Sequence, residues 1–284
     1  MKSQNNTDWV VKPIVPKEVY TDREEFLGYF YKAALAAAER RTVSTVLLGN
    51  RRMGKTEIFK RVVNRLFFGQ APGDPKAVVP VYYSFPDAPR DDRSFAKDYL
   101  ENFMRYYVAF LTGQPELVIM EPKEDRLLSL VEKARPLFPF SKTLDWMMDW
   151  HDSIVKRGTY LPQQDAVEIP RRVSDFDDST IVMFLDEFQN TLMPHYDFEI
   201  LGYMQKAVES PTCPHFVTGS AMSILGIAVR KQGHRGHVRL LGKGACIEGG
   251  RISQGGNLGN HGFGARGQMR RQSLLYHRGY QTGR

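Results

Sequence analysis

The chain has 284 residues, of which 42% are hydrophobic and 25% are charged, and its formal net charge is +7. These fractions are ordinary for a globular protein, and the length allows one large domain or two smaller ones. Two cysteines, Cys213 and Cys246, are too few for a disulfide framework, which predicts reduced thiols. No N-terminal run resembles a signal peptide, and no stretch approaches the roughly 18 apolar residues that span a bilayer. We therefore expect a cytoplasmic protein with no membrane partner.

The positive charge is concentrated in residues 226–284. This segment holds nine arginines and two lysines against one acid, Glu248, a net charge of +10 that leaves −3 for the rest of the chain. It also contains 15 of the 24 glycines and few apolar residues. Such a composition cannot bury a core, so we expect a disordered Gly/Arg-rich tail behind a mildly acidic body.

The chain begins with an arm that shows no helical or strand periodicity. Residues 1–18 are polar and interrupted by prolines, which predicts a poorly ordered N-terminal arm. The following Thr-Asp-Arg-Glu sequence fits a capping box, with Thr21 as the N-cap and Glu24 at the N3 position. Apolar residues then recur at helical spacing, so a helix is expected to begin near Thr21.

Strand and helix patterns alternate along residues 19–225. They predict strands over residues 42–48, 77–85, 180–185 and 215–218, and helices over residues 57–68, 94–111 and 196–210. Pro80 places the second strand at a sheet edge or makes it a strand start. Residues 112–175 are mixed and predict a helical insertion. The alternation predicts one α/β core, a three-layer sandwich around a mainly parallel sheet.

One segment matches the phosphate-binding pattern G-x-x-x-x-G-K-[ST], and its residues are Gly49, Asn50, Arg51, Arg52, Met53, Gly54, Lys55 and Thr56. It follows an apolar strand and precedes an amphipathic helix, as phosphate binding requires. The glycines let backbone N–H groups face phosphate oxygens, and the helix N-terminus adds its positive dipole end. We expect Lys55 to contact the β- and γ-phosphates and the Thr56 hydroxyl to bind magnesium. This P-loop predicts ATP and Mg²⁺ as the bound cofactors.

Two acids follow the apolar strand at residues 181–185. Such a strand delivers Asp186 and Glu187 to the carboxyl edge of a parallel sheet, where open α/β sheets bind ligands. We expect Asp186 to hold magnesium, directly or through water. Glu187 is expected to polarise the attacking water as a general base.

Four further polar residues are candidates with open alternatives. Ser220, with Thr218 as the second choice, could contact the γ-phosphate or orient the attacking water, or could be an ordinary hydroxyl at the end of an apolar strand. Arg23 could lie against the nucleotide base or be a solvated surface arginine. Gln189 could hydrogen-bond near the nucleotide or only cap its loop. Ser220 is the one we assign a catalytic role.

These segments together resemble the archaeal-type ATPases of the AAA/STAND group of P-loop proteins. The resemblance covers about residues 19–225 and rests on YTDREEF, GNRRMGKTE, IVMFLDEFQ and FVTGSAMSIL. It implies a P-loop NTPase sandwich with a five-strand core, a helical lid and often a winged-helix module. It also implies an ATP-dependent switch that commonly self-associates. Carried over by position, Lys55, Thr56, Asp186 and Glu187 take the roles given above.

The sequence departs from this family pattern after Leu225. The resemblance implies an arginine-containing helix, a fifth strand and the lid at this point, but the Gly/Arg-rich tail follows instead. Our hypothesis is that the tail is out of frame or otherwise foreign to the family, which resequencing around codons 220–235 tests. The alternative is a basic tail that binds nucleic-acid phosphates, although it lacks RGG repeats and has few aromatic residues.

The sequence is therefore compatible with three functions. The first is an ATP-hydrolysing molecular switch, and the second is a nucleotide-binding regulator or scaffold with little turnover, because the lid is missing. The third is nucleic-acid binding through the tail. Other P-loop classes fit less well. A GTPase would normally show an Asn-Lys-x-Asp segment that reads the base, and a small-molecule kinase would need an acceptor pocket and a lid; neither pattern is visible in the sequence. The Asp-Glu pair favours hydrolysis.

Overall fold

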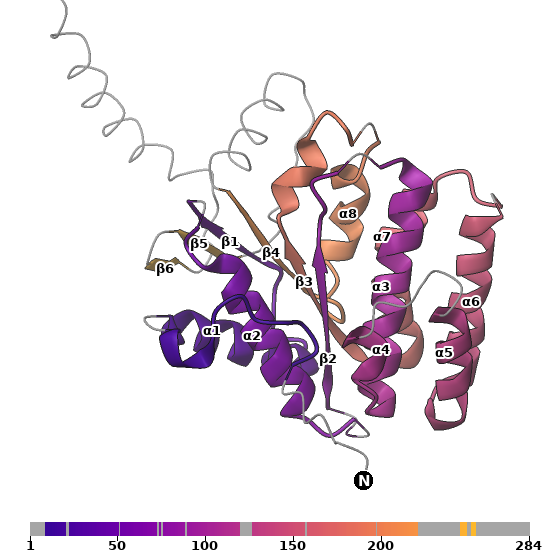
Figure 1. The fold of residues 1–284 in the computed structure, drawn as a ribbon, viewed down its shortest axis with the longest axis horizontal. Helices are drawn as coiled ribbons and strands as arrows, with labels where there is room; N and C mark the ends of the chain where they lie inside the picture. The colour runs from indigo at the N-terminus through magenta and orange to yellow at the C-terminus, as the bar shows by residue number, and fades with distance from the viewer. Residues whose placement is uncertain are drawn as a thin grey trace, which may run out of the picture.

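The computed structural model describes most of the chain between residues 9 and 220 and two short segments beyond. The described residues are 9–20, 23–50, 52–72, 74, 76–88, 90–119, 127–156, 158–196, 198–220, 245–248 and 251–253. They form one sheet with helices on both of its faces (Figure 1). The predicted α/β class with a mainly parallel sheet is confirmed.

The sheet has the strand order β2-β3-β4-β1-β5-β6. Its strands are β1 (Thr45–Gly49), β2 (Val78–Ser84), β3 (Thr180–Asp186), β4 (His215–Ser220), β5 (Ala245–Glu248) and β6 (Arg251–Ser253). The first four in the order are mutually parallel, β5 joins β1 in parallel, and β6 is antiparallel to β5. Strand β2 lies at an edge, where Pro80 removes no ladder hydrogen bond that a central strand would need.

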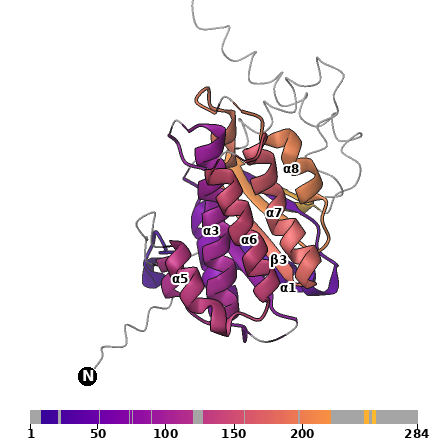
Figure 2. The same ribbon diagram turned by 90° about the vertical axis from the view of Figure 1, so that its right-hand side faces the viewer.

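Helices cover both faces of this sheet. The α-helices of the described residues are α1 (Glu24–Ala36), α2 (Lys55–Phe68), α3 (Asp92–Thr112), α4 (Glu116–Ile119), α5 (Leu127–Ala134), α6 (Ser141–Val155), α7 (Pro162–Asp177) and α8 (Leu201–Val208). Helices α1 and α2 lie on one face, and α3, α7 and α8 lie on the other (Figures 1 and 2). Helices α5 and α6 pack outside α3, so they add a layer beyond the three that were predicted.

The predicted insertion is therefore shorter than residues 112–175. Helix α7 begins inside that range, but it packs against β3, α3 and α8 and belongs to the core. Its sequence hides this role because Pro170 stands inside the helix, and an internal proline usually argues against a continuous helix. Only α4, α5 and α6 are additions to the core layers.

An aromatic cluster fixes α1 and α2 to the sheet. Phe30 of α1 and Phe59 of α2 are fully buried, and their rings meet edge to face with centroids 5.2 Å apart. Phe184 of β3 packs on Phe59, and Phe216 of β4 packs on Phe30, each at 5.3 Å. Burying each such side chain contributes about 2–3 kcal/mol. The cluster therefore holds α2, the helix that follows the P-loop, against the sheet.

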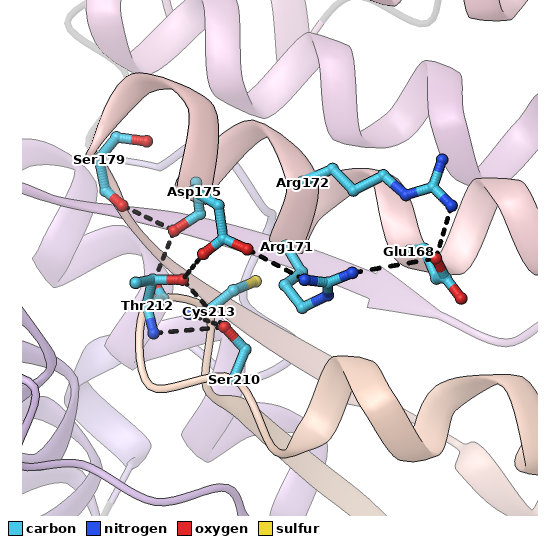
Figure 3. Close-up of polar contacts among 9 residues, drawn as sticks. Glu168, Arg171, Arg172, Asp175, Ser179, Ser210, Thr212 and Cys213 are labelled. Atoms are coloured by element: carbon cyan, nitrogen blue, oxygen red, sulfur yellow. Dashed lines mark hydrogen bonds and ion pairs between the residues drawn. The ribbon is translucent and has the colours of Figure 1, made fainter.

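The turn before β4 is tied to α7 by polar contacts (Figure 3). Thr212 Oγ1 donates to Asp175 Oδ1 at 2.8 Å, and Ser174 Oγ donates to the Thr212 carbonyl at 2.9 Å. Arg171 forms an ion pair with Asp175 at 3.0 Å. Cys213, which is fully buried, donates its N–H to Ser210 Oγ in the same turn. These bonds fix where β4 enters the sheet, at the end remote from the P-loop.

The N-terminal arm is bound to α2 over residues 10–15, contrary to the expectation of a poorly ordered arm. Val10 is buried, and the Asn64 side chain accepts its N–H at 2.8 Å. One turn before Asn64 on the same helix, Arg61 donates to the Val15 carbonyl, and the Glu57 carboxylate accepts the Ile14 N–H at 2.7 Å. The arm lacks periodicity because α2 side chains, rather than its own backbone, satisfy its polar groups.

Two segments of the tail depart from the expected absence of regular structure. Cys246 and Ile247 of β5 pair with β1, whose edge would otherwise leave N–H and C=O groups unpaired. Strand β6 then pairs back on β5. An extended segment can satisfy an edge without helical or strand periodicity of its own, which is why composition alone missed it. The remaining tail residues lie outside the described part, so the expected disorder and nucleic-acid binding stay predictions.

Two expectations about helices need correction or comment. The predicted N-cap, Thr21, lies outside the described residues, and the structure places the N-cap of α1 at Arg23, with no side-chain capping bond. The helix predicted over residues 196–210 is shorter, because α8 covers only Leu201–Val208.

Among the described helices, none combines the length and the apolar character that crossing a membrane requires.

Candidate functional site

The P-loop connects the end of β1 to the start of α2. Gly49 is the last residue of β1, and Lys55 is the first residue of α2. Between them, Arg52 and Gly54 have left-handed backbone conformations, with φ angles of 64° and 75°. Left-handed residues in a turn direct successive N–H groups into one concavity, which is the geometry of anion-binding nests. Arg51 lies outside the described residues.

The remaining P-loop residues divide by exposure. Asn50 and Arg52 are exposed, whereas Met53 and Thr56 are half-buried. Thr56 is the second residue of α2, where the backbone N–H has no partner within the helix. Its hydroxyl therefore lies at the N-terminal end of the helix, where the helix dipole stabilises anions.

Lys55 is held over its own loop. Its ammonium donates to the carbonyl oxygens of Gly49 at 3.0 Å and Asn50 at 2.8 Å. Burial lowers the pKa of Lys55, and the negative charges of Glu187 and Asp186 oppose this shift. Strand β4 pairs in parallel with both β1 and β3, so the loop after β1 and the two acids at the end of β3 leave the sheet in the same direction. The fold thus brings the two halves of the predicted site to one edge of the sheet.

Asp186 is the last residue of β3, and its carboxylate is almost completely buried, with 1% of the residue exposed. Its Oδ1 accepts the Glu187 N–H at 2.9 Å and the hydroxyl of Thr218. Its Oδ2 accepts the Tyr82 hydroxyl at 2.9 Å. A buried carboxylate without such donors would be strongly destabilising, and these three bonds fix the orientation of the Asp186 side chain.

Glu187 differs from its neighbour in both exposure and backbone geometry. The residue is exposed and has a φ angle of 51°, in the left-handed region. This conformation costs a non-glycine residue about 1–2 kcal/mol and turns the chain sharply into the helical turn η5 (Phe188–Leu192). The side chain of Gln189 donates to the Glu187 carboxylate. Gln189 therefore contacts the predicted general base rather than only capping the loop.

The candidates on β4 are placed unequally. Ser220 pairs in register with Gly49, so its backbone stands beside the P-loop, but its side chain lies outside the described atoms. Thr218, the second choice, is buried and donates its hydroxyl to Asp186. Strand β4 separates β1 from β3, so Thr218 lies between the two predicted halves of the site.

Arg23, the N-cap of α1, packs against an aromatic ring of that same helix. Its guanidinium is 5.8 Å from the centroid of the Phe26 ring, an arrangement typical of a cation–π contact. This contact accounts for the side chain without a nucleotide base.

Tyr82 is a site residue that sequence reasoning missed. It stands two residues before the end of β2, and the last residue of that strand, Ser84, pairs in register with Asp186. Side chains two apart on a strand share a face, so the long tyrosine side chain can reach the carboxylate on the next strand. In the sequence, the aromatic strand around Tyr82 indicates only a buried core. A polar tip near the carboxyl end of a strand was the available signal.

No protein-family model matches this chain, and no curated protein matches it either. Its function must therefore be argued from the site itself.

Proposed function

We propose that the chain binds ATP with Mg²⁺ at the carboxyl edge of its sheet and hydrolyses it, in a sandwich of the P-loop NTPase type. The observation that carries this proposal is that the P-loop at the end of β1 and the acids at the end of β3 lie at the same edge of the sheet, because β4 pairs in parallel with both strands. The charges of Asp186 and Glu187 also act on Lys55. A phosphate-binding loop alone would support binding. A buried acid and an exposed acid beside it support metal binding and water activation.

The residues at this edge of the sheet fit both a magnesium ion and the phosphates of ATP. Magnesium takes oxygen ligands and is usually held by one or two carboxylates together with substrate phosphates and water. Thr56 and Asp186 offer a hydroxyl and a carboxylate of this kind. Within the described part of the chain, no group of three or more His, Cys, Asp or Glu residues could hold a metal without such help. The phosphates would be held by the N–H groups of the loop and by Lys55.

Phosphate binding requires Lys55 to exchange partners. Its ammonium now donates to two loop carbonyls, and these weaker acceptors would give way to phosphate oxygens, whose charge-assisted hydrogen bonds are roughly twice as strong. Burial lowers the pKa of Lys55, and the nearby negative charges oppose that lowering, which favours the ammonium form that an anionic ligand requires. Bound magnesium neutralises charge on the phosphates.

We assign the activation of water to Glu187. Its exposed carboxylate can accept a proton from a water molecule as the water oxygen bonds to the γ-phosphorus and the bond to the bridging oxygen of ADP breaks. The bond from Gln189 must be released or shared for this step. Asp186 is not available as the base, because three donors occupy its carboxylate.

The second candidate function, nucleotide binding with little turnover, is favoured by these same two contacts. Both Lys55 and Glu187 are engaged by the protein itself, by loop carbonyls and by Gln189. A site that is slow to release these bonds would bind nucleotide and hydrolyse it slowly.

The Glu187→Gln variant distinguishes the two functions. We expect it to bind Mg-ATP as the wild type does and to lose about 10²- to 10⁴-fold in phosphate release, the usual contribution of a general base. Glu25→Gln, at an exposed position on α1, is the control and should change neither. Equal phosphate release by wild type and Glu187→Gln, with ATP bound, would favour the regulator without turnover.

A further inference from the structure

Tyr82 is buried although its strand, β2, lies at the edge of the sheet. Its ring lies on the face of the sheet that α2 covers, with the Lys60 ammonium 5.9 Å from the ring centroid, and the residue is 8% exposed. The hydroxyl donates to Asp186 Oδ2 across the gap between β2 and β3 at 2.9 Å. Packing would be satisfied by phenylalanine, so the hydroxyl needs an explanation of its own.

The Tyr82 hydroxyl is the donor in this contact, because the Asp186 side chain offers its oxygens as acceptors. A hydroxyl that donates to a carboxylate forms a charge-assisted hydrogen bond, which is stronger than a neutral one.

Three donors from three strands or strand ends hold this one carboxylate. Tyr82 of β2 binds Oδ2, whereas Thr218 of β4 and the Glu187 N–H bind Oδ1. A carboxylate offers about four acceptor positions, so about one is left for magnesium or its water. Tyr82 is the only one of the three that binds the second oxygen among the described residues, and it therefore limits rotation of the carboxylate about its Cβ–Cγ bond.

We propose that Tyr82 is a positioning residue for magnesium, fixing the Asp186 carboxylate so that its remaining acceptor position serves the Mg²⁺ of a bound nucleotide. This inference rests on the proposed function. Residues that hydrogen-bond to a metal ligand set its orientation, and replacing them typically costs 10- to 100-fold in metal affinity. A purely structural tyrosine would affect folding stability and leave the magnesium dependence unchanged.

The neighbouring residue on the same strand provides a matched control. Tyr83 points to the opposite face, where its hydroxyl donates to Asp98 Oδ2 at 3.0 Å and its ring packs against Tyr99. Tyr82→Phe and Tyr83→Phe therefore delete the same group from adjacent positions, each removing one hydrogen bond to a carboxylate. Only the first of these carboxylates belongs to the proposed site.

The experiment measures binding of a fluorescent ATP analogue to the full chain as magnesium is titrated, and again in EDTA. We expect Tyr82→Phe to raise the magnesium midpoint at least about tenfold while binding in EDTA stays at the wild-type level. Tyr83→Phe should keep the wild-type midpoint. An unchanged midpoint in Tyr82→Phe, with magnesium dependence present in the wild type, overturns the inference and leaves the proposed function standing. A wild type that binds no nucleotide overturns both.

A second measurement covers the case in which Tyr82→Phe does not fold. With 3-fluorotyrosine placed at position 82, the hydroxyl and the ring are kept. We expect its fluorine resonance to shift when magnesium is added to the nucleotide-bound protein, and the same label at position 83 to stay unshifted. Equal responses from both labels would contradict a specific link between Tyr82 and magnesium.

Discussion

At the scale of single residues, the two glycines of the P-loop have different roles. Gly54 is needed for its left-handed backbone conformation, whereas Gly49 is not. Gly54 has a φ angle of 75°, and a methyl group added there would meet nothing within 4 Å. Gly49 has no positive φ angle, and an added methyl group would lie 3.6 Å from Met53 Sδ, an ordinary contact. The two glycines of the motif therefore differ in what an alanine would cost.

We predict that Gly54→Ala lowers the free energy of unfolding by about 1–2 kcal/mol, the cost of the left-handed conformation for alanine. Gly49→Ala should be neutral or slightly stabilising, because it reduces the freedom of the unfolded chain without straining the fold. Urea denaturation of both variants checks this pair. A larger loss for Gly49→Ala than for Gly54→Ala would contradict the described loop geometry.

His215 gives the fold a predictable sensitivity to acid. The residue is fully buried at the start of β4, and burial lowers its pKa to about 4, which the nearby backbone of Cys213 only partly opposes. An unfolded histidine titrates near pH 6.5. Between about pH 6.5 and pH 4 the unfolded chain therefore binds a proton that the folded chain does not, and stability falls as the pH falls.

We predict that this single group removes about 3 kcal/mol of folding free energy between pH 7.5 and pH 4. Replacing it by phenylalanine should abolish that part of the pH dependence, whatever the change in absolute stability. Denaturation curves for wild type and His215→Phe across this range give the difference directly. Parallel pH profiles for the two proteins would show that His215 is not buried in its neutral form.

At the scale of elements, helix α2 links the N-terminal arm to the P-loop. Its first turn carries Lys55 and Thr56, and Glu57 immediately after them accepts an arm N–H. Further along the helix, the Asn64 side chain accepts the N–H groups of Val10 and Val11 and donates to the Val11 carbonyl. The arm and the loop are thus held by one rigid element.

Asn64→Ala tests how firmly the arm is held. The variant removes all three bonds and leaves buried arm groups without partners, which costs about 1–3 kcal/mol. We predict faster hydrogen exchange over residues 10–15. Asn64→Asp keeps the acceptor for the two N–H groups and should give an intermediate rate. Exchange at the wild-type rate in Asn64→Ala would mean that the arm is held by other contacts.

At the scale of the whole molecule, sequence periodicity predicts the parallel core. It does not predict segments whose structure depends on contacts with residues distant in sequence. The strand before Gly49 and the strand before Asp186 were expected within a few residues of β1 and β3, because buried parallel strands are continuous apolar runs. The arm, the short β5 and the contact of Tyr82 with Asp186 depend on partners distant in sequence. The local sequence pattern of α7 does not indicate what the helix packs against, so it does not distinguish a core helix from part of an insertion. Self-association, expected from the family resemblance, stays a prediction.

Equilibrium calorimetry on the full chain measures whether the carboxyl edge of this sheet binds Mg-ATP, as proposed. Lys55→Ala removes the charged group expected to hold the phosphates, whereas Lys32→Ala removes an exposed lysine from α1. We predict saturable binding by the wild type and by Lys32→Ala, and binding about 10- to 100-fold weaker in Lys55→Ala, the loss expected for hydrogen bonds to a charged group. Folded wild-type protein that shows no binding of Mg-ATP would contradict the account.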